Sequence, residues 1–237
     1  MLKCPTCGRE NDEFGLVCVG CKGFLQNRIP NLDLFETAWE ILESPRSAFR
    51  RIALADRKNY VLVLFLLFGT ALAVALSWYT RLGRHFDTLL DFLPVVSAGG
   101  IAIGGVLVVI LPAGYHILAR MMGGGGSYRA SVGLLAYSAI PIILSLIFVL
   151  PIELLTFGMY LFTSNPHPYV IKPVSYIVLV SLDVLLAVWS MVLAGIGTSV
   201  VHRMGRWKSA MLVMVLLAVL GSGFAGAALV LEDVFPG

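Results

Sequence analysis

Four cysteines near the start of the chain carry the clearest chemical signal. They form two Cys-x-x-Cys pairs, Cys4 with Cys7 and Cys18 with Cys21, separated by ten residues. Each pair makes a tight turn that aims two thiolates at one point, and two such turns supply the four ligands of a tetrahedral zinc site. Four protein ligands leave no position for substrate, so we expect one structural Zn²⁺ per chain that also helps this short segment to fold. Rubredoxin-type iron and a redox dithiol are alternatives, although a redox centre needs only one pair.

A single acid inside an apolar stretch is the second candidate. Asp183 is the only acidic residue within the predicted membrane spans, where a charge is costly unless it is neutralised or hydrogen-bonded. If its helix begins near Val174, Asp183 lies deep in the bilayer and is a candidate for a proton or ligand relay, with Ser145 and Ser190 as partners. If the helix begins at Val184 instead, Asp183 lies at the outer interface and carries no such implication.

Three further polar residues have structural interpretations that compete with functional ones. Tyr137 is typical of a buried hydroxyl with a backbone partner. His116 and His202 lie near span ends, where a joint metal or proton site is the alternative to two headgroup-facing imidazoles. We find no HExxH motif, no paired glutamates with histidines and no serine–histidine pair at a common membrane depth, so we expect that the protein is not an enzyme.

Long apolar segments must position these candidates. Of 237 residues, 58% are hydrophobic and 13% charged, and the mean hydropathy of +0.88 is too high for a soluble domain. We predict an all-α membrane protein, a five-helix transmembrane bundle with a small N-terminal zinc-ribbon head. The expected units are a zinc ribbon at 1–30, juxtamembrane amphipathic helices at 31–58 and a five-span membrane domain at 59–237. The spans are expected at about residues 60–80, 94–119, 130–151, 175–201 and 209–231, with Glu153 just beyond the third.

Basic residues are distributed unequally between the two ends of these spans. By the positive-inside rule this places the N-terminus in the cytoplasm and the C-terminus outside a cytoplasmic membrane. One side has ten lysines and arginines: Arg46, Arg50, Arg51, Arg57, Lys58, Arg120, Arg129, Arg203, Arg206 and Lys208. The other side has three: Arg81, Arg84 and Lys172. We expect six of the ten at the membrane surface: Arg46, Arg50, Arg51, Arg203, Arg206 and Lys208. The net charge of +3 and a head without a basic face argue against a nucleic-acid partner.

Two juxtamembrane helices are predicted before the first span. The first has an apolar stripe that includes Phe35 and Trp39, opposite an acidic face. The second follows Ser44-Pro45 and carries Arg46, Arg50 and Arg51, so it lies either in the headgroup layer or packed beneath the bundle. Within the spans, small residues four apart, such as Gly100 and Gly104, allow close helix packing inside one chain or in a homo-oligomer.

Several short motifs lie in and around the spans. They are Trp39, the segment SPRSAFRRI at 44–52, the segment AYSAIP at 136–141 and Trp189. Together they resemble the Yip family, and the resemblance covers residues 34–231. It implies a five-helix bundle with a cytosolic N-terminus. Eukaryotic members interact with Ypt/Rab GTPases at Golgi and endoplasmic-reticulum membranes, whereas the zinc ribbon in front is similar to a prokaryotic variant.

Two functional hypotheses follow. The first is a non-enzymatic membrane adaptor or scaffold that recruits a cytosolic protein partner through the ribbon and organises membrane or trafficking components. The alternative is a transporter, channel or lipid-handling protein with a route near Asp183. A path for polar cargo generally needs more than one polar residue at mid-depth, which favours the adaptor.

Overall fold

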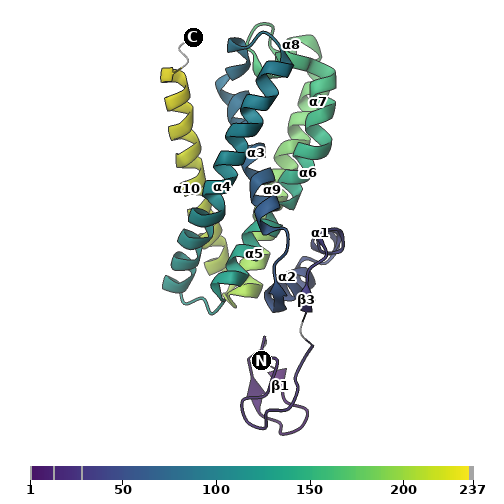
Figure 1. The fold of residues 1–237 in the computed structure, drawn as a ribbon, viewed down its shortest axis with the longest axis vertical. Helices are drawn as coiled ribbons and strands as arrows, with labels where there is room; N and C mark the ends of the chain where they lie inside the picture. The colour runs from purple at the N-terminus through teal and green to yellow at the C-terminus, as the bar shows by residue number, and fades with distance from the viewer. Residues whose placement is uncertain (1, 13, 28, 235–237) are drawn as a thin grey trace.

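Five long apolar helices form an upright bundle, with a small N-terminal lobe below it and the C-terminus at the opposite end (Figure 1). The computed structural model describes residues 2–12, 14–27 and 29–234. All five helices are long and apolar enough to cross a bilayer, which confirms the predicted fold class. The five are Val61–Thr80, Leu89–Met121, Tyr128–Phe162, Pro173–Val201 and Arg206–Val234.

Four of the five spans are single helices, and the third is broken. The single helices are α3 (Val61–Thr80), α4 (Leu89–Met121), α9 (Pro173–Val201) and α10 (Arg206–Val234). The third span runs through α5 (Tyr128–Ser138), α6 (Ile140–Leu144), the π-helical segment η2 (Ser145–Val149), α7 (Leu150–Phe157) and the 3₁₀ segment η3 (Gly158–Phe162). Two short elements complete the far end: η1 (Leu82–His85) and α8 (Pro168–Ile171).

Pro141 accounts for the first break in the third span. Helix α5 ends at Ser138, and α6 begins just before Pro141, as expected for a residue that cannot donate to the helical ladder. The backbone N–H of Ile142 donates instead to Ser190 Oγ on α9, at 3.3 Å. A hydroxyl on the neighbouring helix therefore satisfies a backbone group where the ladder is interrupted.

Helices α3 and α4 approach each other so closely that glycine is required on both sides. A Cβ atom at Gly104 would lie 2.7 Å from Leu66 Cα, and one at Gly100 would lie 3.0 Å from Thr70 N. On the facing helix, a Cβ at Gly69 would lie 2.5 Å from Gly104 Cα. The Gly100/Gly104 pair is therefore used for packing within the chain rather than between chains.

The segment before the bundle contains two helices and two short strand pairs. Helix α2 (Pro45–Leu54) buries Phe49 and Ile52 completely, and Phe49 packs where Gly197 on α9 leaves room for its ring. Of the two expected positions, the one beneath the bundle is therefore observed. Strand β3 (Ile29–Asn31) pairs in parallel with β4 (Ala55–Arg57), and β1 (Leu2–Lys3) pairs antiparallel with β2 (Glu10–Asn11) inside the lobe.

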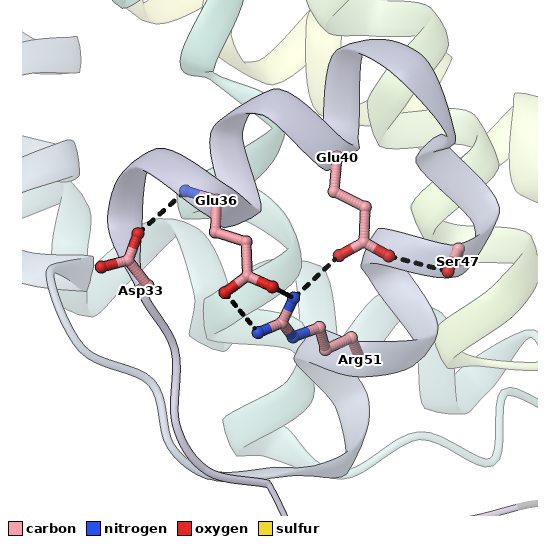
Figure 2. Close-up of polar contacts among 5 residues, drawn as sticks. All are labelled: Asp33, Glu36, Glu40, Ser47 and Arg51. Atoms are coloured by element: carbon pink, nitrogen blue, oxygen red, sulfur yellow. Dashed lines mark hydrogen bonds and ion pairs between the residues drawn. The ribbon is translucent and has the colours of Figure 1, made fainter.

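Helix α1 (Leu34–Glu43) turns its acidic face toward α2 (Figure 2). Its N-cap is Asp33, whose carboxylate accepts from the Glu36 N–H at 2.9 Å. Arg51 on α2 donates to Glu36 at 2.5 and 2.7 Å and to Glu40 at 3.4 Å. The ion pair joins α1 to α2, and the buried face of α1 carries Thr37 and Ile41, while Phe35 is 83% exposed.

Candidate functional site

The four cysteines of the head converge on one point. Their sulfur atoms all lie within 4.8 Å of one another, with 3.5 Å between Cys4 and Cys21 and 3.6 Å between Cys7 and Cys18. A tetrahedral zinc ion with bonds of about 2.3 Å requires sulfurs about 3.8 Å apart, so the four thiols fit this metal. Cys4 and Cys18 are buried, whereas Cys7 and Cys21 are exposed.

The two cysteine pairs have the same backbone geometry. In each, the residue after the second cysteine adopts a left-handed conformation: Gly8 has φ 72° and Lys22 has φ 57°. The N–H of Gly8 donates to Cys4 O at 2.9 Å, and the N–H of Lys22 donates to Cys18 O at 3.0 Å. Each turn thus returns its second thiol toward its first, which explains why the spacing of two residues matters.

Backbone N–H groups around Cys18 favour the thiolate, the form that binds metal. The amide of Cys21 makes the largest contribution, followed by that of Gly20, and together they lower the pKa of the Cys18 thiol to about 6. The residues therefore suit a structural Zn²⁺, which would tie the two turns together. Four sulfur ligands leave the metal no position for substrate.

An ion pair and a ring contact hold the head against the bundle. The guanidinium of Arg203, which follows α9, donates to both carboxylate oxygens of Asp12, at 2.5 Å for Oδ2. Its Cζ atom lies 4.8 Å from the centroid of the Phe14 ring. Arg203 holds the pKa of Asp12 below its ordinary value, so this contact is charged at neutral pH.

A second polar site lies inside the bundle, around Asp183. Helix α9 begins at Pro173, so Asp183 lies about 15 Å along the helix. Ser145 Oγ donates to its carboxylate, as expected, whereas Ser190 bonds to Ile142 instead. Ser145 begins the π-helical segment, and such wide turns are frequent at functional sites.

Glu153 is the residue that the sequence interpretation misplaced. We expected it just beyond the third span, but that span continues to Phe162 and includes it. Its side chain is buried, with 6% exposure, and it lines the same cavity as Asp183. Asp183 is therefore not the only acid within the spans, and the two acids form a pair.

The acid pair borders a cavity of about 320 Å³. Ser145, Glu153 and Asp183 are its charged or hydroxyl-bearing lining residues, and the rest of the wall is apolar or aromatic, including Trp78 on α3. This volume and composition are typical of small-molecule pockets, which combine an apolar wall with a few convergent polar groups.

A third polar cluster lies at the end of the bundle nearer the head. Ser131 Oγ lies 3.0 Å from His116 Nδ1 and 3.0 Å from His202 Nε2. The expectation that no serine and histidine share a membrane depth was therefore wrong. Ser131 is fully buried, and Gly124 and Gly126 cover His202 so closely that a Cβ at either would lie 2.9 Å from its Nδ1. No substrate can reach this serine, so the cluster serves to join helices. Burial lowers the pKa of His202 to about 4 and keeps the ring neutral.

The remaining candidate residues make structural contacts. Tyr137 is fully buried, and its hydroxyl donates to Asn59 O at 2.9 Å. Arg51 pairs with Glu36, and Lys208 donates to Met122 O at 3.4 Å. Five of the six basic residues are exposed and Arg51 is half-buried; the exposed ones are Arg46, Arg50, Arg203, Arg206 and Lys208.

Comparison with known proteins identifies the membrane domain. A family model described as the Yip1 domain matches residues 39–227, which is most of the chain. No curated protein and no solved structure matched the chain. The match covers all of α2 to α9 and most of α10. The chain is therefore a multi-pass membrane protein that belongs to the Yip1 domain family.

Proposed function

We propose that the protein is a non-enzymatic membrane adaptor whose head recruits a cytosolic protein partner. The observation that carries this proposal is the exposed apolar surface of the head. Val19 is 82% exposed and Phe24 63% exposed, on a lobe whose backbone is set by the four cysteines. Exposed apolar side chains gathered on a small fixed lobe are typical of a protein-contact surface.

Attachment of the head supports this role. The contacts of Arg203 with Asp12 and Phe14, together with the β3–β4 pairing, anchor the lobe at one end of the bundle. Phe14 therefore faces the bundle, whereas Val19 and Phe24 remain accessible. A partner bound there would be held at a fixed distance from the membrane.

The charge distribution supports a cytoplasmic position for this lobe. The head, α2 and the start of α10 share one end of the bundle (Figure 1). That end carries exposed Arg46 and Arg206, and the segment before α10 adds Arg203. We propose an N-terminus in the cytoplasm of a prokaryotic cell, where reducing conditions also keep the cysteines available for Zn²⁺.

Helix α1 would add a contact with the same leaflet. It lies to the side of the bundle near its lower end (Figure 1), with Phe35 and Trp39 exposed and its acids turned toward Arg51. Aromatic side chains are enriched at the membrane–water interface, and the neighbouring helix α2 carries the exposed Arg46 and Arg50. We propose that α1 lies in the headgroup layer and fixes the height of the head.

Photo-crosslinking in native membranes tests the adaptor function. A photoreactive residue would replace Val19 or Phe24, and the same residue at Phe14 would be the matched control that faces the bundle. We expect one dominant cytosolic protein from the first two positions and crosslinks within the chain from Phe14. Crosslinks only to lipid or to the chain itself from all three positions would refute recruitment by the head.

A second candidate function is handling of a small solute or lipid, as a transporter, channel or lipid-handling protein. Two carboxyl groups and a hydroxyl at mid-depth, beside a cavity, favour it more than a single acid would. Flux or lipid movement in proteoliposomes should then stop in Asp183→Asn and persist without the head. An unchanged rate in Asp183→Asn would exclude this candidate.

A further inference from the structure

The cavity at Glu153 and Asp183 opens toward lipid rather than toward water. Its wall combines α3, the third span and α9, and includes Ala75 and Val184, which are exposed on the outer surfaces of α3 and α9. Both residues lie within apolar spans, so the surface around them faces hydrocarbon in a bilayer. A ligand that enters between α3 and α9 therefore arrives from within the membrane.

The acid pair supplies two carboxyl groups to the same cavity. Ionising both in an apolar cavity would place two like charges side by side, which is costly. In the described part of the chain, no lysine, arginine or histidine forms an ion pair with either acid.

A basic residue next to the cavity wall makes its contacts elsewhere. Arg81 follows α3 and stacks on the Trp78 ring at 5.1 Å, on a residue that lines the cavity. Its guanidinium donates to Leu161 O at 3.3 Å and contacts His167 at 3.1 Å. A carboxylate in this cavity is thus left without an ion-pair partner among the described residues.

We infer that this cavity binds a membrane-borne amphiphile with a single ammonium group on an alkyl chain. The ammonium would donate to Glu153, Asp183 and Ser145, whose oxygens all accept, and the chain would lie along the apolar wall. Charge complementarity selects a cation over a neutral or anionic head, and a volume of about 320 Å³ limits the ligand to a small head with one chain. The inference names a ligand class for the second candidate function, but binding requires neither transport nor a cytosolic partner.

Trp78 provides a reporter inside the cavity. The other tryptophans, Trp39, Trp189 and Trp207, are exposed and can be replaced by phenylalanine to leave one fluorophore. The protein would be titrated in uncharged dodecyl maltoside micelles at pH 7 with dodecylamine, which is protonated there, and in parallel with dodecanol. We expect a saturable change in Trp78 emission with the amine and no saturable change with the alcohol.

Variants of the acid pair test the assignment. Glu153→Gln/Asp183→Asn keeps the volume and hydrogen-bonding capacity and should weaken dodecylamine binding at least tenfold, whereas Glu232→Gln, at an exposed acid, should leave it unchanged. Equal responses to amine and alcohol in the protein with Glu153 and Asp183 intact would overturn the inference even if the double variant failed to fold. An unchanged affinity for dodecylamine in a folded double variant would also overturn it.

A third titration distinguishes the source of the ammonium group. If lysophosphatidylethanolamine, which carries an ammonium group and a single acyl chain, suppresses the dodecylamine response when it is added to the micelles, the natural ligand is a lipid headgroup amine. If it does not, the ligand is a free amphiphilic amine. Loss of binding in these experiments would leave the partner crosslinks from Phe24 unaffected, so the two proposals fail separately.

Discussion

Substitution of Gly104 by alanine should weaken the contact between α3 and α4 and destabilise the bundle. The new Cβ would lie 2.7 Å from Leu66 Cα and closer still to the Phe65 carbonyl oxygen. Ordinary carbon–carbon contacts are about 3.5–4.0 Å, so α3 would have to retreat by about 1 Å. Both nearby atoms are backbone, which cannot rotate out of the way.

The size of the effect follows from that displacement. A gap of 0.5–1 Å forfeits roughly a quarter to a half of each dispersion contact, and overpacking of a well-packed site costs about 1–3 kcal/mol. We expect a loss in the upper part of that range, because Gly69 and Gly100 belong to the same close contact and would be pulled apart as well.

Gly105→Ala is the matched control for this measurement. Gly105 is the next residue of the same helix, and a Cβ there would meet nothing within 4 Å. Unfolding of both variants would be followed by circular dichroism during titration with sodium dodecyl sulfate. We expect the free energy of unfolding of Gly105→Ala to stay within about 0.5 kcal/mol of the parent. Equal losses in the two variants would refute the close-packing explanation.

Three further predictions concern charged groups. Asp12→Asn should release the head from Arg203. Because the pKa of Asp12 is depressed in the folded protein, the contact should be constant above the ordinary aspartate pKa of 3.8 and weaken as the pH falls below 3.8. Spin-label distances between head and bundle would show both effects, and a distance that is unchanged by the substitution would contradict the contact. Burial lowers the pKa of Lys58 to about 8, so the unfolded chain binds more protons than the folded chain above that pH. The free energy of unfolding should therefore rise from about pH 8 to 10.5, and this rise should be lost in Lys58→Met. Thermal melts across that range would test the direction of the change. Arg51→Ala should free α1 from α2 with little loss of global stability, because Glu36 is largely exposed. Proteolysis should then cut near α1 first, and no change in cleavage would argue against the ion pair.

Local sequence signals were sufficient for the head and the spans. The two Cys-x-x-Cys turns each close through their own backbone, so their spacing predicts that the four thiols meet. Hydropathy likewise predicts the five helices, because lipid-facing length and composition do not depend on how the helices pack. The break at Pro141 is also a local property of one residue.

The intramembrane site could not be predicted in this way, because it depends on tertiary burial. Glu153 ends an apolar run and is typical of a span boundary, yet the helix continues past it since Asp183 and Ser145 provide polar surroundings from other elements. Similarly, His202 and Ser131 are separated by 71 residues, and only packing brings them together. A charged residue at the end of an apolar segment is thus a weak boundary when a second acid lies at matching depth.

The orientation of α1 shows a different limit. Its period predicts one apolar and one acidic face but not which face is covered. In the structure the covered face is that of Thr37 and Ile41, and the pairing of Arg51 with Glu36 and Glu40 leaves Trp39 outside, 71% exposed.

The dependence of the Phe24 crosslink on the cysteines tests recruitment by the metal-tied head most directly. The yield of the cytosolic product would be compared between the chain with all four cysteines and Cys7→Ser, with the amount of protein in the membrane and the bound zinc measured on the same samples. We predict that Cys7→Ser loses both the zinc and the crosslink while the bundle stays folded. A crosslink that persists at full yield without zinc would contradict a metal-dependent recruiting surface and reduce the head to a structural cap.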